Sequence, residues 1–412
     1  MNSARHGVLR YSFRPIPNRT PMSTATRLAA PTADHESELT AWRDTVRRFF
    51  AAEVEPHYER WEKDGIIPKT LYRKMGEAGL LCVDTPEDYG GVGAPFEFSC
   101  VVVEEAARMG FLALASNLTV HSDIVAPYIL HLGTEQQKQK YLPGMARGEC
   151  IGAIAMTEPG AGSDLQGIKT TALRAGDHYL INGSKTFITN GQNAGVVVVA
   201  TKTDPKAGAK GTTLFTLDTT LPGFKRGRNL DKIGLHAADT SELFFDNVRV
   251  PASEVLGRVG GGFGHLIDEL PRERLVLAVG AVGHAQGALE KTLEYVTSRK
   301  AFGQPLASFQ NTRFELARLK TDLEVHRAFM EKCTRLYAEG RLDVPTAAMV
   351  KLATTEMEGR VTDACLQLFG GYGYMTEYPI SRFFADARIQ RIYGGTSEIM
   401  KEVIARSLVG RT

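Results

Sequence analysis

The hydrophobic pattern of the chain changes twice, and each change marks a different kind of secondary structure. Over residues 36–148, apolar residues recur at intervals of three and four, as at Trp42, Val46 and Phe49. This is the period of an amphipathic helix. Glycines and prolines interrupt the pattern between Pro86 and Pro95. The first third of the chain is therefore predicted to be helical.

The middle of the chain consists of short β-branched and aromatic runs that are separated by turn residues. Tyr179–Ile181 and Thr186–Thr189 flank Asn182-Gly183, a pair typical of a two-residue hairpin turn. We therefore predict a compact, antiparallel, β-barrel-like domain. Its further predicted strands are Val196–Ala200, Thr213–Leu217 and Glu242–Phe245.

Helical periodicity returns after the glycine cluster at 260–264, in four long segments that predict a four-helix bundle. The fold class is therefore mainly α with a central β domain. The four predicted helices cover residues 263–297, 305–338, 345–372 and 379–407. The predicted divisions are a disordered leader at 1–35, an N-terminal helical domain at 36–150, the β domain at 151–258 and the bundle at 259–412.

Composition excludes two classes of protein. With 412 residues, of which 43% are hydrophobic and 23% charged, the chain has enough apolar material for more than one core, but no apolar run approaches the length of a membrane span. A net charge of +2 is spread over 49 basic and 47 acidic residues, without the basic stripe that nucleic acid binding requires. We expect neither a membrane span nor a nucleic acid partner.

The cysteines and histidines show no spacing typical of a metal site, so we predict none. The cysteines also lack the paired spacing of a disulfide framework, which indicates a reducing compartment. The five are Cys82, Cys100, Cys150, Cys333 and Cys365.

The first residues have the composition of a mitochondrial transit peptide, because they are rich in arginine and contain no acid before Asp34. An upstream start codon explains them equally simply, since Met22 opens a second plausible beginning. We expect a bacterial cytoplasmic protein, with the mitochondrial matrix as the alternative compartment.

A glycine-rich segment, Ala155–Gly167, follows a predicted strand and reads AMTEPGAGSDLQG. Amides around Gly160, Gly162 and Ser163 could converge on a phosphate. By itself the segment is more typical of a tight connection between domains. The second cluster, VGGGFG at 259–264, is a weaker signal because no strand and no Lys-Ser pair accompany it.

Ala155–Gly167 resembles the first signature of the acyl-CoA dehydrogenase family, and Gln367–Asp386 resembles the second. The likeness extends from about residue 40 to the end and is greatest to the long-chain branch. It implies an FAD enzyme that removes two hydrogens from the α,β carbons of an acyl-CoA thioester and passes electrons to an electron-transferring flavoprotein. Further matching segments are Lys185–Gly191 (KTFITNG), Arg299–Gly303 (RKAFG) and Arg391–Met400.

The resemblance also implies which residues bind the flavin. A second set would come from the neighbouring subunit, which makes a homo-oligomer, expected to be a tetramer, part of the prediction. Read alone, Phe187 could be a core aromatic and Arg299 a solvated charge. The residues implied for a chain's own flavin are Met156, Thr157, Gly162, Ser163, Phe187, Thr189, Thr396, Ser397 and Glu398, and those for the neighbour's flavin are Arg299, Phe302, Gln310, Gln367, Gly370 and Gly371.

The reaction needs a carboxylate beside the acyl α-carbon. Most of the family places it between a tyrosine and Gly-Thr, where this chain has Gly394. The isovaleryl and long-chain branches resemble the chain at ELPRERL instead, which makes Glu273 the predicted base and Glu269 the reserve. Glu273 shares an apolar helical stripe with Val276 and Leu277, so burial should raise its pKa. The alternative is an ordinary surface pair of Glu273 with a neighbouring arginine.

By the same resemblance, Arg274 faces CoA, Ser163 lies near the thioester, and amides around Gly394 and Gly395 polarise its carbonyl. Such fixed donors are physically required, because negative charge builds on that oxygen as the proton leaves. Two other functions are compatible with the sequence. One is an acyl-CoA oxidase or flavin monooxygenase on the same fold, and the other is a catalytically silent flavin-binding scaffold.

Overall fold

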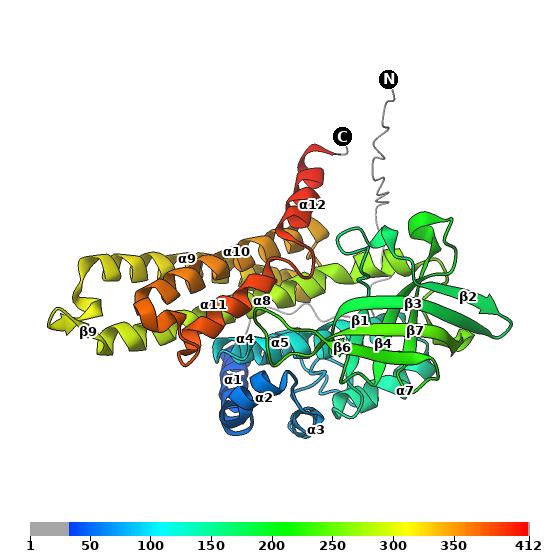
Figure 1. The fold of residues 1–412 in the computed structure, drawn as a ribbon, viewed down its shortest axis with the longest axis horizontal. Helices are drawn as coiled ribbons and strands as arrows, with labels where there is room; N and C mark the ends of the chain where they lie inside the picture. Colours follow the sequence, from blue (N-terminus) through cyan, green and yellow to red (C-terminus); the bar gives the residue numbers. More distant parts are fainter. Residues whose placement is uncertain (1–32, 411–412) are drawn as a thin grey trace.

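The computed structural model describes residues 33–410, which form helices around a sheet at one end and a long helical bundle at the other (Figure 1). The predicted fold class, mainly α with a central β domain, is confirmed. The leader predicted at 1–35 lies outside the described residues, except for its last three. These three already belong to the first helix, α1 (Ala33–Glu53).

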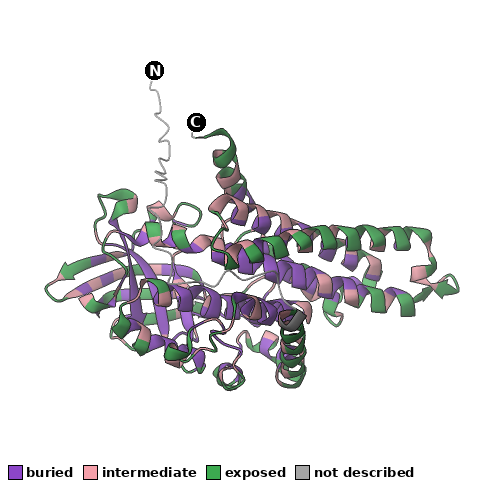
Figure 2. Ribbon diagram, turned by 180° about the vertical axis from the view of Figure 1, so that it is seen from behind, coloured by how far each residue is buried: buried purple, intermediate pink, exposed green. Residues whose placement is uncertain are grey.

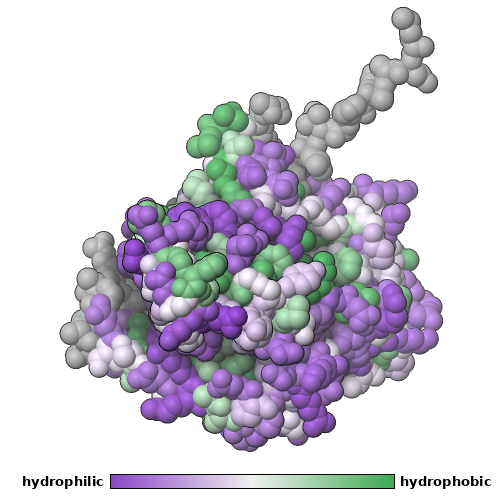
Figure 3. Space-filling model, turned by 60° about the vertical axis from the view of Figure 1, so that its left-hand side comes forward, coloured by the Kyte–Doolittle hydropathy of each residue, from purple (hydrophilic) through white to green (hydrophobic). Residues whose placement is uncertain are grey.

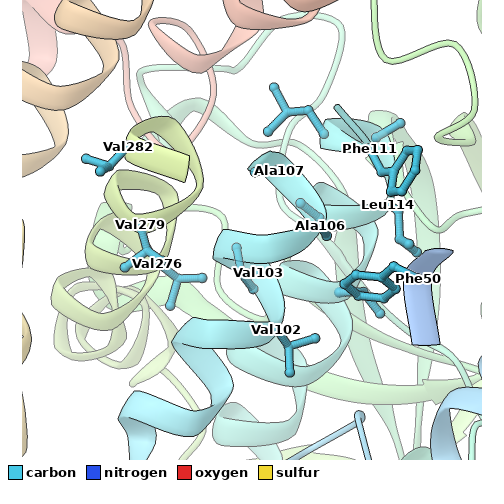
Figure 4. Close-up of a cluster of buried hydrophobic side chains, with 14 of the residues drawn as sticks. Phe50, Val102, Val103, Ala106, Ala107, Phe111, Leu114, Val276, Val279 and Val282 are labelled. Atoms are coloured by element: carbon cyan, nitrogen blue, oxygen red, sulfur yellow. The ribbon is translucent and has the colours of Figure 1, made fainter. Parts of the chain in front are cut away.

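The N-terminal helices form a core around α4 (Phe96–Arg108). Figure 4 shows α4 between α8 and α1, with Val103 directed toward Val276 and with Phe50 on the opposite side. α4 therefore presents apolar side chains to both neighbours, as its run of valines and alanines requires, and Glu104 and Glu105 add ion pairs to arginines of α1. The other N-terminal helices are α2 (Tyr58–Asp64), α3 (Lys69–Glu77), α5 (Leu112–Leu118), α6 (Ala126–Leu132) and α7 (Glu135–Ala146), with short turns at Glu55–His57 and Glu87–Tyr89.

One helical segment departs from α geometry. Between α5 and α6, Thr119–Val125 is a π-helix, and all but one of its residues are buried. π-Helical turns are rare and often occur at functional sites. This segment, η3, joins the sheet to the helical part of the molecule, because His121 accepts a hydrogen bond from the Gly152 amide and Asp123 pairs with Arg272.

The sheet has eight strands in the order β6-β7-β3-β2-β4-β5-β8, with β1 paired to β4. It is not closed into a barrel, so the barrel-like arrangement that we predicted is wrong. It is also mixed, because β1 and β2 pair with β4 in parallel. The strands are β1 (Gly152–Ala155), β2 (Thr171–Ala175), β3 (His178–Thr189), β4 (Val196–Lys202), β5 (Thr212–Asp218), β6 (Phe224–Asn229), β7 (Thr240–Pro251) and β8 (Val255–Leu256).

The predicted hairpin turn at Asn182-Gly183 is wrong, since both residues lie inside the continuous strand β3. Gly183 has a φ of 150° and sits at a register shift in the pairing with β7, so it marks a bulge. The hairpin turn lies at Gly176-Asp177, where Ala175 pairs with His178. The positive φ of Gly176 is what a tight two-residue loop requires.

The bundle is built on α8 (Gly262–Ser298), whose centre is buried between α4 and α10 (Figure 2). A Cβ at Gly287 would lie 1.9 Å from the Arg108 carbonyl oxygen, so this close approach of α8 to α4 requires glycine. Among helices of the described residues, none is both long and apolar enough to span a bilayer.

The fourth long helix predicted, at 379–407, is two helices. Gly394 and Gly395 have φ values of 62° and 97° and break it, and the Thr396 side chain then caps the next helix by accepting from the Ile399 amide. The remaining C-terminal elements are β9 (Lys300–Ala301), β10 (Gln304–Pro305), α9 (Gln310–Ala338), α10 (Val344–Phe369), α11 (Pro379–Gln390) and α12 (Ser397–Val409).

Candidate active site

Glu273 lies on α8 and is only 4% exposed, which contradicts the alternative of a solvated surface carboxylate. The Tyr128 hydroxyl, on α6, donates a hydrogen bond of 2.9 Å to its Oε1. The neighbouring Arg272 is committed elsewhere, to Asp84 and Asp123. The structure therefore presents a buried carboxylate whose hydrogen-bond partner is a tyrosine hydroxyl and not an arginine.

Burial, assisted by the nearby Glu269 carboxylate, raises the pKa of Glu273 from its ordinary value of 4.5 to about 7. The hydrogen bond from Tyr128 and the charge of Arg274 act in the opposite direction. A carboxylate with this pKa accepts a proton more readily than an exposed one and is still substantially ionised at neutral pH. The predicted effect of burial is confirmed.

Glu269, the reserve candidate, lies one turn earlier on α8. It is also buried, and its Oε1 lies 2.9 Å from Nδ1 of His131 on α6. Glu269 thus already has a partner that can carry a positive charge, whereas Glu273 has a neutral one. This difference makes Glu273 the better placed of the two to receive a proton.

Arg274 is 3% exposed, and its Nε and Nη1 atoms have no hydrogen-bond partner among the described residues. Burial lowers its pKa to about 10. A buried guanidinium with free donors is costly unless a ligand supplies the acceptors. A Cβ at Gly395 would lie 4.0 Å from its Nη2, so Arg274 adjoins the loop between α11 and α12.

That loop is held in place by a lysine that belongs to no sequence motif. Lys351, on α10, is fully buried, and its Nζ donates a hydrogen bond of 2.8 Å to the Gly395 carbonyl. Burial and the nearby charge of Arg274 lower its pKa to about 8. Behind the loop, Ser397 donates 2.6 Å to Glu356, while Glu398 is exposed on α12.

The predicted flavin loop is fixed by another lysine, Lys185 of β3. Its buried Nζ donates 2.9 Å to the Met156 carbonyl and 2.8 Å to Glu158 Oε1. Glu158 also accepts from the amides of Lys169 and Thr170. The Thr157 carbonyl accepts from the Thr186 amide, whereas its own amide donates to no residue in the described range. The amide is therefore free for a ligand.

The other predicted flavin contacts are open on one side. Phe187 is 66% exposed with a φ of 59°, so it is not a core aromatic, and Thr189 ends the same strand, half-buried. A Cβ at Gly160 or Gly162 would meet nothing within 4 Å, and Ser163 is exposed beside them. The structure leaves space over these backbones for a large ligand.

The second predicted set lies at the other end of the bundle, near β9, and the structure does not bring it to the first (Figure 1). Phe302 is 95% exposed, and the Arg299 guanidinium lies 5.0 Å from the centre of the Tyr372 ring. Gln367 lines a groove of about 410 Å³ between α9, which begins at Gln310, and α10. Gly370 and Gly371 follow α10 and have no atom near their missing side chains.

Four residues of the site were missed by the sequence reasoning: Tyr128, His131, Lys185 and Lys351. Lys185 could have been found, because it lies inside the matched segment KTFITNG. Tyr128, His131 and Lys351 follow no motif, and only the packing of α6 and α10 against α8 reveals them. In the part of the chain described, no group of three His, Cys, Asp or Glu side chains is arranged to hold a metal.

Comparison with known proteins covers nearly the whole chain. Family models match it at residues 36–149 (acyl-CoA dehydrogenase, N-terminal domain), 153–248 (middle domain) and 260–409 (C-terminal domain). The long-chain specific acyl-CoA dehydrogenase, mitochondrial, of Sus scrofa is 47% identical over 375 residues, 90% of this chain and 87% of that protein.

Two solved structures extend the comparison. The acyl-CoA dehydrogenase from Geobacillus kaustophilus is 46% identical and superposes with a TM-score of 0.89 over 94% of this chain and 100% of its own. A glutaryl-CoA dehydrogenase from Mycobacterium smegmatis, in complex with FADH2, is 30% identical, with a TM-score of 0.86 over 91% of this chain and 95% of its own.

Proposed function

Since this chain belongs to the acyl-CoA dehydrogenase family and is an FAD-dependent enzyme, we propose that it dehydrogenates long-chain fatty acyl-CoA thioesters to trans-2-enoyl-CoA with Glu273 as base. One observation supports this assignment above others. Glu273 is a buried carboxylate with a pKa of about 7, while the commoner position of the base holds Gly394. The long-chain preference rests on the likeness to long-chain relatives.

In this proposal, Glu273 accepts the α-proton through the carboxylate oxygen that Tyr128 does not hold. The amides of Gly394 and Gly395 stabilise the negative charge that develops on the thioester oxygen. Their backbone is held in place from behind by Lys351. Arg274 directs its two unpaired donors toward acceptor atoms of the CoA portion, and Ser163 lies near the thioester.

FAD, when bound, supplies the acceptor for the hydride that leaves the β-carbon. The residues present fit it, since the free Thr157 amide, the open glycines and the exposed Phe187 offer a donor, space and an aromatic face. We assign its ring to Met156, Thr157, Phe187 and Thr189, its pyrophosphate to Gly162 and Ser163, and further contacts to the start of α12, Thr396 to Glu398.

We further propose that two chains complete each flavin site. The neighbour would contribute the second set through the groove beside Gln367. Apolar side chains near that end of the bundle, such as Phe302 and Phe314, are exposed in the single chain, which supports the proposal that another chain covers them. The same holds for Leu408 and Val409 on the projecting, hydrophobic end of α12 (Figure 3). A homotetramer, built as a pair of dimers, is the expected assembly.

The proposed electron acceptor is an electron-transferring flavoprotein, and the proposed compartment is the bacterial cytoplasm, with the mitochondrial matrix as the alternative. Relatives from both settings support these two locations.

The test is an anaerobic titration of the purified protein with acyl-CoAs of graded chain length, followed through the flavin spectrum. The wild type should be bleached best by long chains. Glu273→Gln should bind the same acyl-CoAs and lose ~10²–10⁴-fold in the rate of bleaching. Wild-type bleaching by Glu273→Gln would refute the base, and a high yield of hydrogen peroxide in air would indicate an oxidase.

A further inference from the structure

Two carboxylates on α8 face two hydrogen-bonding side chains on α6 in matching register. Glu269 and Glu273 are one turn apart, as are His131 and Tyr128. His131 pairs with Glu269 and Tyr128 with Glu273, both at 2.9 Å. The two helices thus give each carboxylate a different partner, one that can be cationic and one that is neutral.

Tyr128 is fully buried, and its phenol is neutral throughout the physiological range because burial, followed by the charge of Glu273, raises its pKa well above the ordinary value. A neutral hydroxyl donates one hydrogen bond, and here it donates to Oε1 of Glu273. Within the described chain, the second oxygen of Glu273 accepts no hydrogen bond. One oxygen is therefore fixed while the other stays available.

We propose that Tyr128 is a positioning residue for the reaction, which fixes Oε1 of Glu273 so that the second oxygen points to the substrate and which favours the ionised carboxylate. The inference rests on the proposed role of Glu273 as base. A hydrogen bond to an ionised carboxylate is stronger than one to the neutral acid. Tyr128 therefore offsets part of the effect of burial without adding a charge to the site.

Several charged groups also face Glu273 and must be held constant in a test. They are Glu269 and Arg274 on α8, His131 on α6, and Lys351 on α10, which adjoins Arg274. Replacing Tyr128 with phenylalanine removes one oxygen atom and alters none of these charges. The chain also offers a matched control, because buried Tyr141 donates a hydrogen bond of the same length, 2.9 Å, to Glu254 on a different element.

The experiment measures the titration of Glu273 in the FAD-loaded protein without substrate. The infrared band of its protonated carboxyl group is the band that disappears when Glu273→Gln is introduced. This assignment is made separately in the wild type, in Tyr128→Phe and in Tyr141→Phe. Tyr128→Phe should move the midpoint upward by about one pH unit, from the size of a hydrogen bond to a charged group. Tyr141→Phe should leave it unchanged. An unmoved midpoint in Tyr128→Phe, or an equal shift in both variants, would overturn the proposal.

In Tyr128→Phe, the acidic limb of the pH profile for flavin reduction should shift by the same amount as the midpoint of Glu273. At pH values above this limb, the rate of flavin reduction should fall by about ten-fold, a smaller loss than removal of the base itself would cause. If Tyr128→Phe does not fold, wild-type protein labelled with 3-fluorotyrosine decides the question. Its more acidic phenol should lower the midpoint, and no change would refute the role of Tyr128. An error in the assignment of Glu273 as base would give a different result from an error in the role of Tyr128. In that case the flavin of Glu273→Gln would be reduced at the wild-type rate, whatever the effect of Tyr128→Phe on the midpoint of Glu273.

Discussion

At the scale of single residues, the burial of Glu273 links catalysis to stability with a definite sign. Its folded pKa of about 7 lies above the ordinary value of 4.5, so folding favours the neutral acid. The stability that this group contributes is full below pH 4.5 and is lost as the pH rises through 7. A carboxylate that is suited to accept a proton therefore weakens the fold at the pH at which it works.

Glu273→Gln should accordingly be more stable than the wild type at pH 8, by up to about 3 kcal/mol, because the amide needs no desolvation of charge. The difference should vanish near pH 4, where both side chains are neutral. Urea unfolding of the two proteins at both pH values measures it. Equal stability at pH 8, or a gap that widens toward acid, would contradict the burial argument.

Gly394 offers a second test at this scale, because a carboxylate there would restore the family's commoner arrangement. A Cβ on Gly394 would lie 2.4 Å from Cδ1 of Leu277, one turn beyond Glu273 on α8. The double variant Glu273→Gly, Gly394→Glu should therefore recover little flavin reduction until Leu277 is shortened.

Adding Leu277→Ala to the double variant should raise the rate of flavin reduction about ten-fold, which corresponds to relief of an overpacking cost. Stopped-flow reduction by one acyl-CoA compares the two variants. Leu277→Ala in the wild-type background is the control and should not accelerate reduction. If the triple variant is no faster than the double, the positive φ of Gly394 rather than Leu277 is the obstacle.

At the scale of elements, the Lys185–Glu158 pair connects strand β3 to the segment after β1. It holds Met156 and Thr157 at a fixed distance from Phe187, two residues along β3 from Lys185. Lys185 is buried, and burial lowers its pKa to about 8, although Glu158 acts in the opposite direction. The pair thus aligns two segments that we assign to the flavin.

Lys185→Met should lower the free energy of unfolding by roughly 3–5 kcal/mol, because it leaves the Glu158 carboxylate buried without its cation. It should also reduce FAD occupancy. Adding Glu158→Gln should recover part of both losses. Denaturant unfolding and the flavin-to-protein absorbance ratio measure them. Lys74→Met, which breaks the exposed pair with Glu53, is the control and should change neither quantity appreciably. A Lys185→Met protein with full FAD would refute the alignment.

The elements also show what sequence periodicity can and cannot predict. The long apolar stripes of α8, α9 and α10 were predicted because burial along one helix is a local pattern. Asn182-Gly183 was misread because a bulge and a turn use the same residue types. The interruption at Gly394 was missed because hydrophobic periodicity continues on both sides of it.

The site shows the same limit. Burial of Glu273 was predictable from its own helix, because Val276 and Leu277 continue the apolar stripe. Its partner Tyr128 was not, because that contact joins residues 145 positions apart and depends on the register of α6 against α8. Pairing across elements is decided by tertiary packing, which one sequence does not show.

At the scale of the whole molecule, the separation of the two predicted flavin sets has a consequence for mixed assemblies. A chain with Glu273→Gln retains Arg299, and a chain with Arg299→Gln retains Glu273. If the neighbour supplies Arg299, a mixed dimer has one intact site. This site combines Glu273 of the Arg299→Gln chain with Arg299 of the Glu273→Gln chain, whereas the other site lacks both residues.

Coexpression of the two inactive variants should therefore restore roughly a quarter of the wild-type rate of flavin reduction, because half of randomly paired dimers are mixed and each has one complete site. Each variant alone should stay inactive. Stopped-flow reduction and native mass spectrometry of the mixture measure rate and composition. Mixed dimers without activity would show that each chain completes its own site.

The open sheet leaves this protein with an outermost strand at each end of its strand order, which a closed barrel would not have. Unpaired edge strands invite pairing with another chain and so promote aggregation. One edge here, β8, is only two residues long. The other, β6, exposes Lys225, Arg226 and Arg228 along six residues. Repulsion between these cations opposes the approach of a second β6, so this end of the sheet is protected from edge-to-edge assembly even while a newly made chain has not yet found its neighbours.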